Sequence, residues 1–348
     1  MIIEFIQLKK HLENSSFEPG CPDEICIWKK YDKVFLCEKN MTASSLTIAT
    51  RESPLALCQA HYVKQRLKQI HPELTVTLLG MTTRGDTMQD VSLLTAGGKS
   101  LFVKELEDAL LTGRADIAVH SMKDVPMILP AGLCLNVMCE REDPRDVFIS
   151  NRFSELEQLP AHAIVGTSSL RRQSQLLARY PDVEARELRG NVNTRLSRLD
   201  NGDYDAIVLA AAGLIRLNLA DRIRYFLSLE QSLPAAGQGV LGIECRDNDR
   251  ETQRLIAPLN HLASYICVKA ERAMCKRLGG GCHVPVAAYA EKKNGQVYLR
   301  GLVATPDGKL VLRASRSDAW EQAEILGESV ANDLLQQGAE DVLKKIGR

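Results

Sequence analysis

An acid and an amine stand side by side, as Asp124 and Lys123, just after a short apolar run at residues 117–119. The run is too short for a helix and has polar neighbours, which favours a buried parallel strand. Ligands of open α/β sheets bind just past the carboxyl ends of strands, where Ser121, Lys123 and Asp124 are expected. A functional carboxylate is one interpretation of this segment, and a simple surface Lys–Asp loop is the other.

Arginine replaces lysine through the middle of the chain. No lysine occurs between Lys123 and Lys269, whereas ten arginines lie from Arg171 to Arg224. The guanidinium fork binds carboxylate or phosphate with two parallel hydrogen bonds. Many of these arginines fall at expected strand ends or first helical turns, which favour anions. The pattern predicts a site for a ligand with many carboxylates; structural ion pairs are the alternative, and a phosphate ligand lacks a P-loop or GxGxxG motif.

Cys282 follows three glycines and precedes His283, Val284 and Pro285. A thiol on such a bare loop is suited to act as a nucleophile or a covalent tether. An incidental loop cysteine is the alternative. A metal site built from Cys275, Cys282 and His283 would lack a fourth ligand at a usual spacing.

The elements that position these residues alternate between strand and helix. Strands are expected at residues 46–49, 74–79 and 117–119, and a helix at 102–111. Another helix is expected from Pro54 to about residue 70, with Ser53 as its N-cap. The same order returns later, with strands at 163–165, 183–188 and 205–209. A Thr and a Ser shortly before the first helix of each stretch, and a shared Arg-Gly-Asp/Asn segment, indicate an internal duplication with a ligand cleft between the lobes.

The fold class expected is therefore α/β, with two similar lobes of mixed sheets and a small C-terminal α+β domain. A strand at 240–243 is expected to cross back into the first lobe. The expected divisions are an N-terminal extension at 1–42, lobe 1 at 43–139 plus 238–258, lobe 2 at 145–234, and the C-terminal domain at 262–348. The extension is expected to be loosely ordered, or to reflect a misassigned start before Met41.

Eight segments in this order resemble the porphobilinogen deaminase (hydroxymethylbilane synthase) family. They are IATRESPLAL, GGKSLFVKELE, DIAVHSMKDVP, EREDPRDVF, VGTSSLRRQ, LRGNVNTRL, LPAAGQG and GGGCHVP. The resemblance extends from about Leu46 to the C-terminus. It implies lobes like those of periplasmic binding proteins. It also implies a transferase of tetrapyrrole and haem biosynthesis, which condenses four porphobilinogens head to tail into hydroxymethylbilane with loss of ammonia.

The resemblance also implies a dipyrromethane cofactor, covalently attached to Cys282 as a thioether. Asp124 matches the catalytic carboxylate, for which cationic pyrrole and azafulvenium species give a chemical reason when the carboxylate is buried. The other matching positions bind acetate and propionate groups. On the cofactor these are Ser121, Lys123, Thr167, Ser168, Ser169, Arg171, Arg172 and Arg195; on the substrate they are Arg51, Ser53, Lys99, Phe102, Arg189, Arg216 and Gln238.

One position departs from the family pattern: Thr95 stands in the glycine loop where a lysine is usual, so a lid contact is either missing or supplied by Lys99.

Net charge is zero and aromatic content is 5%, which argues against a nucleic-acid binder. Reduced cysteines without CxxC spacing, no signal peptide and no membrane-length apolar run favour a cytoplasmic, monomeric enzyme without metal. The rival is a non-catalytic, two-lobed anion-binding protein.

Overall fold

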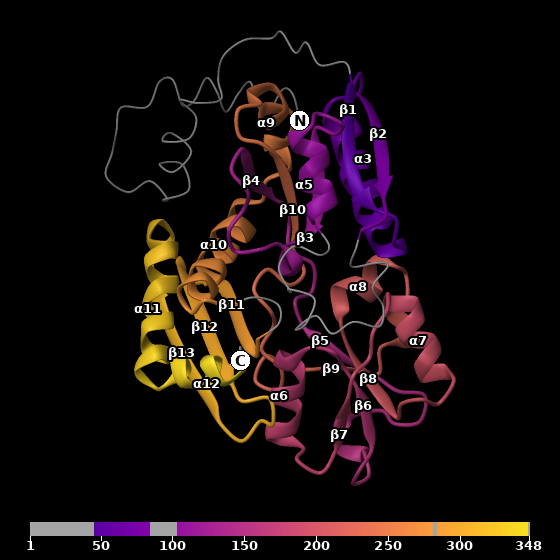
Figure 1. The fold of residues 1–348 in the computed structure, drawn as a ribbon, viewed down its shortest axis with the longest axis vertical. Coiled ribbons are helices and arrows are strands. Elements are labelled where there is room, and N and C mark those ends of the chain that lie inside the picture. Colours follow the sequence, from indigo (N-terminus) through magenta and orange to yellow (C-terminus); the bar gives the residue numbers. More distant parts are fainter. Residues whose placement is uncertain (1–44, 84–102, 281–283, 347–348) are drawn as a thin grey trace. The chain divides into compact units, whose positions relative to one another are not determined.

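The computed structural model describes residues 45–83, 103–280 and 284–346. Residues 43–348 form one compact unit, to which everything below refers. Two five-stranded sheets and one three-stranded sheet make up its framework (Figure 1). The expected α/β class with two sheet-containing lobes and a small C-terminal domain is confirmed.

The first sheet has the order β2-β1-β3-β10-β4. Strand β1 runs parallel to β2 and β3, whereas β10 is antiparallel to β3 and β4. These strands are β1 (Ser45–Arg51), β2 (Thr75–Met81), β3 (Ile117–Ser121), β4 (Leu133–Met138) and β10 (Leu241–Arg246). Because β10 comes late in the chain yet pairs with β3, the chain returns to this sheet as expected.

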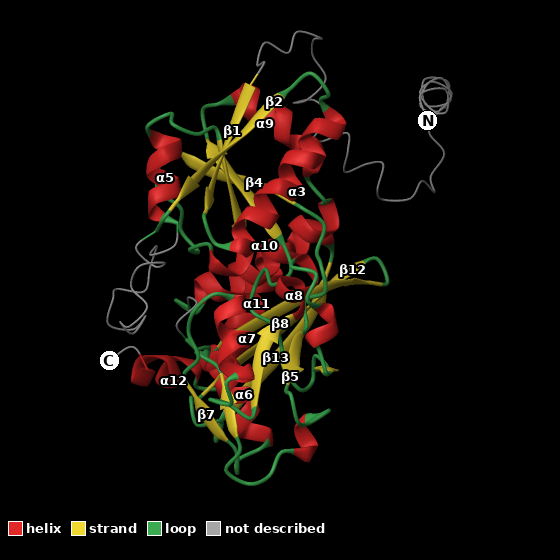
Figure 2. Cartoon of the chain, turned by 90° about the vertical axis from the view of Figure 1, so that its right-hand side faces the viewer, coloured by secondary structure: helices red, strands yellow, loops and turns green. Residues whose placement is uncertain are grey.

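Helices cover both faces of this sheet because its strands alternate their side chains. Ile117 and Val119 of β3 pack with one face of α3 (Pro54–Ile70), while Ala118 packs with α5 (Lys104–Leu111). Figure 2 shows these two helices on either side of the strands. Helix α9 (Arg250–Ile256) adds Leu255 and Ile256 to the α3 side.

The second sheet repeats the pattern of the first, with the order β7-β6-β8-β5-β9. Strand β6 is parallel to β7 and β8, and β5 is antiparallel to β8 and β9. The strands are β5 (Asp146–Ile149), β6 (Ile164–Gly166), β7 (Glu184–Arg186), β8 (Ala206–Ala210) and β9 (Tyr225–Phe226). The helices are α6 (Leu170–Arg179), α7 (Val192–Asp200) and α8 (Ala211–Arg216). The parallel strands keep the same order and directions in both sheets, which supports the internal duplication, although the antiparallel strand beside them comes last in the chain in one sheet (β10) and first in the other (β5).

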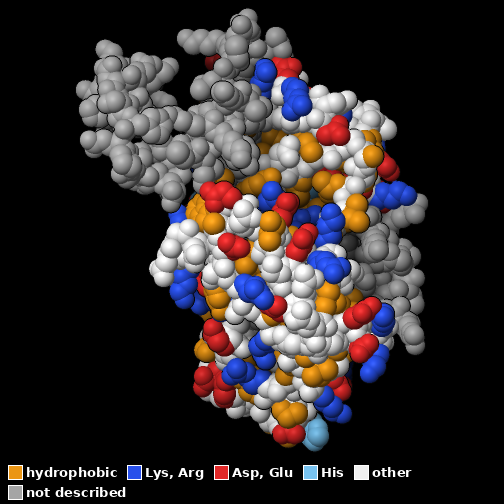
Figure 3. All heavy atoms as spheres, turned by 90° about the vertical axis from the view of Figure 1, so that its left-hand side faces the viewer, with side chains coloured by type: hydrophobic (Ala, Val, Ile, Leu, Met, Phe, Trp, Pro, Cys, Tyr) orange, Lys and Arg blue, Asp and Glu red, His pale blue; other side chains and the backbone are white. Residues whose placement is uncertain are grey.

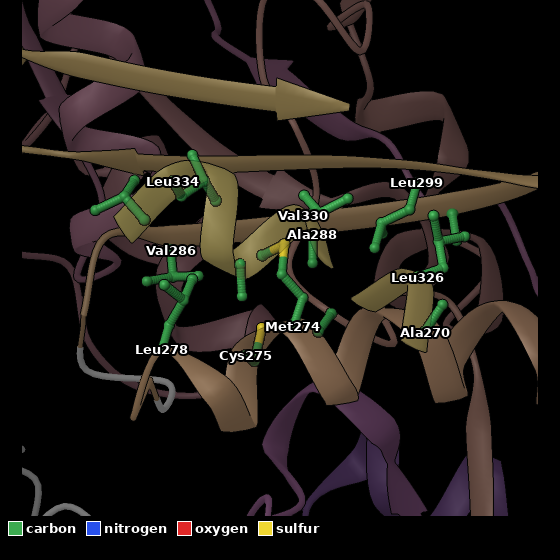
Figure 4. Packing of buried hydrophobic residues seen from close by; sticks show 14 of the residues in the cluster. Ala270, Met274, Cys275, Leu278, Val286, Ala288, Leu299, Leu326, Val330 and Leu334 are labelled. Carbon is green, nitrogen blue, oxygen red and sulfur yellow. The ribbon is translucent and has the colours of Figure 1, made fainter. Parts of the chain in front are cut away.

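The C-terminal part is a three-stranded antiparallel sheet covered by helices. Its elements are α10 (Leu262–Arg277), β11 (Val286–Lys293), β12 (Gln296–Ala304), β13 (Val311–Asp318), α11 (Ala323–Gln336) and α12 (Ala339–Ile346). Figure 4 shows Met274 of α10, Leu299 of β12 and Val330 of α11 pointing into one apolar core. A Cβ on Gly301 would lie 2.5 Å from the Met274 sulfur, so β12 needs glycine for the helix to pack this closely.

Charge on the described surface is mixed. Figure 3 shows Lys and Arg side chains interspersed with Asp and Glu side chains over one face, which agrees with the zero net charge. Among the described residues, no helix is both long enough and apolar enough to cross a membrane.

Candidate functional site

The segment after β3 carries Ser121, Lys123 and Asp124. Residues Met122–Asp124 form one 3-10 turn, and the Met122 amide donates to the Val240 carbonyl at 2.9 Å. Gly237 has a φ of +73° and backs directly on this turn, since a Cβ there would lie 2.6 Å from the Met122 Cβ. The segment of residues 237–240 therefore holds the turn in place.

Asp124 itself is exposed, which differs from the buried carboxylate expected from the resemblance. Within the described residues its carboxylate forms no hydrogen bond and no ion pair. Ser121, one turn earlier, is held by the Gln59 side-chain amide at 2.9 Å. The site thus offers a fixed backbone with a carboxylate left available to a ligand.

Arg171 and Arg172, at the start of α6, both bind the buried carboxylate of Asp146 at the start of β5. The closest nitrogen–oxygen distance is 2.8 Å for each arginine, and the Asp146 side chain is fully buried. Ser232 and Gln238 donate to the same carboxylate at 2.7 and 3.0 Å. Burial alone would raise the pKa of Asp146, but the two guanidinium groups hold that pKa far below its usual range.

This cluster ties three parts of the chain together. Arg171 also donates to the Leu233 carbonyl at 2.6 Å, and Gln238 to the Pro144 carbonyl at 2.6 Å. The anion that Arg171 and Arg172 share in this structure is therefore a residue of the protein itself, Asp146. Their expected contact with cofactor carboxylates, and that of Gln238 with substrate, stay predictions.

Lys123 and Arg195 both lie within electrostatic range of Asp124. Burial lowers the pKa of Lys123 to about 8, and Asp124 opposes that shift while Arg172 and Arg171 reinforce it. Burial likewise lowers the pKa of Arg195 to about 10, again with Arg172 adding to the shift and Asp124 opposing it. Since charges affect each other's pKa only at short range, the turn after β3 and the starts of α6 and α7 converge.

Arg195 has no carboxylate partner among the described residues. Its Nε donates to the Gly190 carbonyl at 2.8 Å, which orients the guanidinium group without neutralising it. Arg189, at the end of the preceding segment, pairs with the exposed Glu187 at 2.6 Å. Arg195 is therefore better placed than Arg189 to receive an anionic ligand.

The remaining expected binding residues lie at element ends, as predicted. Ser53 caps α3 by accepting from the Ala56 amide at 3.4 Å, with Pro54 at the first helical position. Ser168 donates to the Leu188 carbonyl at 2.6 Å, and Thr167 accepts from the Ser169 amide at 3.2 Å. These contacts are structural, so a role in ligand binding is not needed to explain them.

Two further arginines lie at the end of β1 and on α8. Arg51 is half-buried as the last residue of β1. Arg216 donates to the Gly239 carbonyl at 2.7 Å, and burial lowers its pKa. Cys282, Lys99, Phe102 and Thr95 lie outside the described residues, so their expected roles stay predictions.

Helix α10 braces the segment that carries Asp124. Arg272 donates to the Val125 carbonyl at 3.1 Å, and Val268 packs with Met122 and Val125. The neighbouring Glu271 is fully buried and accepts from the amides of Gly237 and Ala290 at 2.6 and 2.7 Å. The helix that leads into the glycine loop of Cys282 is thus fastened to the turn of Asp124.

Family models cover most of the chain. Residues 46–254 match the model described as the porphobilinogen deaminase dipyrromethane cofactor binding domain. Residues 265–336 match the porphobilinogen deaminase C-terminal domain. The chain belongs to the porphobilinogen deaminase family. Membership confirms the resemblance and the dipyrromethane cofactor, and it associates the chain with tetrapyrrole biosynthesis.

Solved structures similar to this porphobilinogen deaminase family member include several substrate-binding proteins. A periplasmic substrate-binding protein of an ABC transporter from Coxiella burnetii is 14% identical, covers 62% of this chain and 91% of its own, and has a TM-score of 0.41. A nutrient-binding protein from Burkholderia cenocepacia, bound to methionine, is 14% identical, with coverages of 61% and 90% and a TM-score of 0.39. These TM-scores are low, and the fold is instead described by the strand order of the three sheets.

The described residues fit a cofactor that bears several carboxylates. Lys123, Arg172 and Arg195 carry positive charge within electrostatic range of Asp124 or of one another. Arg195 has no carboxylate partner among the described residues, so its guanidinium group can bind a carboxylate of an anionic ligand.

Sequence reasoning missed two residues of this site. Asp146 lies in the segment EREDPRDVF, which supported the resemblance but suggested no role for that residue. Glu271 lies within a helix and carries no local signal. The contact between the buried Asp146 and two arginines far from it in sequence can be recognised only in the folded structure.

Proposed function

We propose that this chain is a hydroxymethylbilane synthase, a transferase that joins four porphobilinogens head to tail and releases ammonia at each step. The observation that carries the proposal is the exposed carboxylate of Asp124, without a described partner, within electrostatic range of Arg195, which has no carboxylate partner among the described residues. A binding protein for polyanions needs the cations but has no use for the acid. An enzyme that generates positive charge on its substrate needs both.

The cations hold the acetate and propionate groups of the pyrroles. Lys123 and Arg195 are suited to this because burial disfavours their charged forms, which a ligand carboxylate nearby stabilises. A charge-assisted hydrogen bond in such surroundings contributes about 1.5–3 kcal/mol. Each added pyrrole brings two carboxylates, so the arginines around β6, α6 and α7 supply contacts for successive rings.

Asp124 acts on the substrate's reacting groups. Loss of ammonia from the aminomethyl carbon leaves a cationic ring, which a nearby carboxylate stabilises electrostatically. Once the new carbon–carbon bond has formed, the proton on the joined ring carbon must leave, and the same carboxylate can accept it. The turn of Met122–Asp124 fixes the backbone from which this carboxylate extends.

Cys282 is the proposed attachment point of the dipyrromethane, through a thioether. When bound, this group supplies the pyrrole end to which new rings are joined. Lys123, Arg171, Arg172 and Arg195 would hold its carboxylates, with Ser121 and residues 167–169 beside them. Arg51, Ser53, Arg189, Arg216, Gln238, Lys99 and Phe102 are proposed for the incoming substrate.

A cytoplasmic, monomeric enzyme with the domain divisions at 43–139 plus 238–258, 145–234 and 262–348 remains part of the proposal. The test is incubation of the purified protein with porphobilinogen, followed by acid and oxidation. An enzyme gives uroporphyrin, detected by its absorbance and fluorescence, together with ammonia. Binding of porphobilinogen without either product would instead establish the two-lobed anion-binding protein.

A further inference from the structure

Two cysteines face each other on neighbouring strands of the first sheet, away from the charged set around Asp124. Cys134 of β4 and Cys245 of β10 are register partners on antiparallel strands, and both strands are labelled in Figure 1. Their sulfur atoms lie 3.6 Å apart, although 111 residues separate them in sequence. Facing residues of antiparallel strands have Cα atoms about 4.5–5.5 Å apart, within the roughly 4.4–6.8 Å that a disulfide spans.

The two thiols differ in access and in acidity. Cys134 is half-buried on an edge strand, whereas Cys245 is fully buried. The side-chain amides of Asn136 and Gln253 lie 3.3 and 3.7 Å from the Cys134 sulfur. A hydrogen bond from the Cys245 thiol lowers the pKa of Cys134, and the same contact together with burial raises the pKa of Cys245.

We propose that Cys134 and Cys245 are a peroxide-responsive thiol pair that closes reversibly to a disulfide. Accessible, more acidic thiols beside a second thiol are the ones that hydroperoxides oxidise productively. The Cys134 thiolate takes one oxygen from the hydroperoxide to give a sulfenic acid, and with one proton the other oxygen leaves as water or alcohol. The Cys245 sulfur then attacks the Cys134 sulfur, and the S–O bond breaks with release of water.

The disulfide would join the edge strand β4 to β10. The loop it closes contains all of the second sheet, β5 to β9. A cross-link over so long a loop restricts the unfolded chain, which stabilises the folded one. This inference is independent of the proposed function, because neither cysteine belongs to the proposed binding residues.

The experiment treats the reduced full-length protein with hydrogen peroxide, blocks free thiols with iodoacetamide and digests it with trypsin. The expected product joins the peptide of residues 124–141 to that of residues 225–246. The first peptide also contains Cys139, so fragmentation must assign the bond to Cys134. Dithiothreitol should separate the peptides again, and the oxidised protein should melt higher than the reduced one, by roughly 5 °C or more.

Matched variants make the outcome specific. Cys134→Ser should abolish both the joined peptides and the rise in melting temperature. Cys58→Ser, at a half-buried thiol that donates to the Arg216 carbonyl, should leave both unchanged. The proposal is wrong if, in the wild type, Cys134 and Cys245 are recovered alkylated, or if Cys134 is recovered as sulfinic acid without the disulfide.

Discussion

At the scale of single residues, Asp124 distinguishes an enzyme from a binder. Its carboxylate is exposed and forms no hydrogen bond or ion pair among the described residues. Its charge raises the pKa of the neighbouring Lys123 and of Arg195 on α7, against the effect of burial. An acid kept free beside cations costs little stability but leaves a group for chemistry. We therefore expect Asp124 to contribute to function rather than to folding.

Asp124→Asn should fold normally and lose porphobilinogen turnover by about 10³-fold or more. The amide keeps the size of the side chain but neither stabilises a cation nor accepts the proton. Steady-state rates of uroporphyrin formation test this, with urea unfolding as the check on folding. A purified Asn variant with near-normal turnover would remove Asp124 from the mechanism.

Titration of Lys123 should make activity fall at alkaline pH. Burial lowers its pKa to about 8, so the amine is charged below that pH and loses its proton as pH rises through it. Attraction for carboxylates should therefore weaken above pH 8. Arginine keeps its charge throughout this range, so Lys123→Arg should extend the alkaline limb of kcat/KM to higher pH. Identical alkaline limbs in the two proteins would show that Lys123 does not titrate in the substrate-binding step.

At the scale of elements, the sequence predicts helices better than short strands. Helix α3 was predicted to its cap and its end, because Ser53-Pro54 and His71-Pro72 are strong local signals. Strands β4 and β5 were not predicted. β5 has only the four residues Asp146–Ile149, and its meaning depends on pairing with β8 and β9.

In the candidate site, too, local positions were predictable from the sequence but contacts between distant residues were not. The positions of Arg171 and Arg172 at the start of α6 were predictable from Ser169 and the preceding strand. Their partner was not, since Asp146 lies 25 residues upstream of Arg171 on a strand without a sequence signal. The arginine bias therefore has two causes, an internal acid and an expected ligand, which sequence alone does not separate.

Arg172→Leu should destabilise the second lobe by roughly 3–5 kcal/mol, because it leaves the buried Asp146 short of a partner. Arg222→Leu is the matched control, since Arg222 pairs with the exposed Asp200 and its loss should cost at most about 1 kcal/mol. Urea unfolding measures both. Equal, small losses in the two variants would show that the Asp146 cluster does not hold the lobe together.

At the scale of the whole chain, two distant segments meet at the turn of Met122–Asp124. The chain returns to the first sheet through β10, Gly237 backs on Met122, and α10 holds Val125 through Arg272. The crossing was predictable from the late apolar strand, but the bracing by α10 was not, because Arg272 and Glu271 look like ordinary helix residues. This assembly connects the turn of Asp124 with the helix that leads to Cys282.

The central claim is that this chain builds its product on a covalent dipyrrole at Cys282, and the mass of the denatured protein tests it most directly. Protein from cells that make porphobilinogen should exceed its polypeptide mass by one dipyrrole unit, and substrate should add single-pyrrole steps up to a limit. Cys282→Ser should lack the extra mass, whereas serine at Cys58, Cys134 or Cys267 should retain it. A wild-type protein that weighs only its polypeptide, or an added mass on another cysteine, would contradict the account.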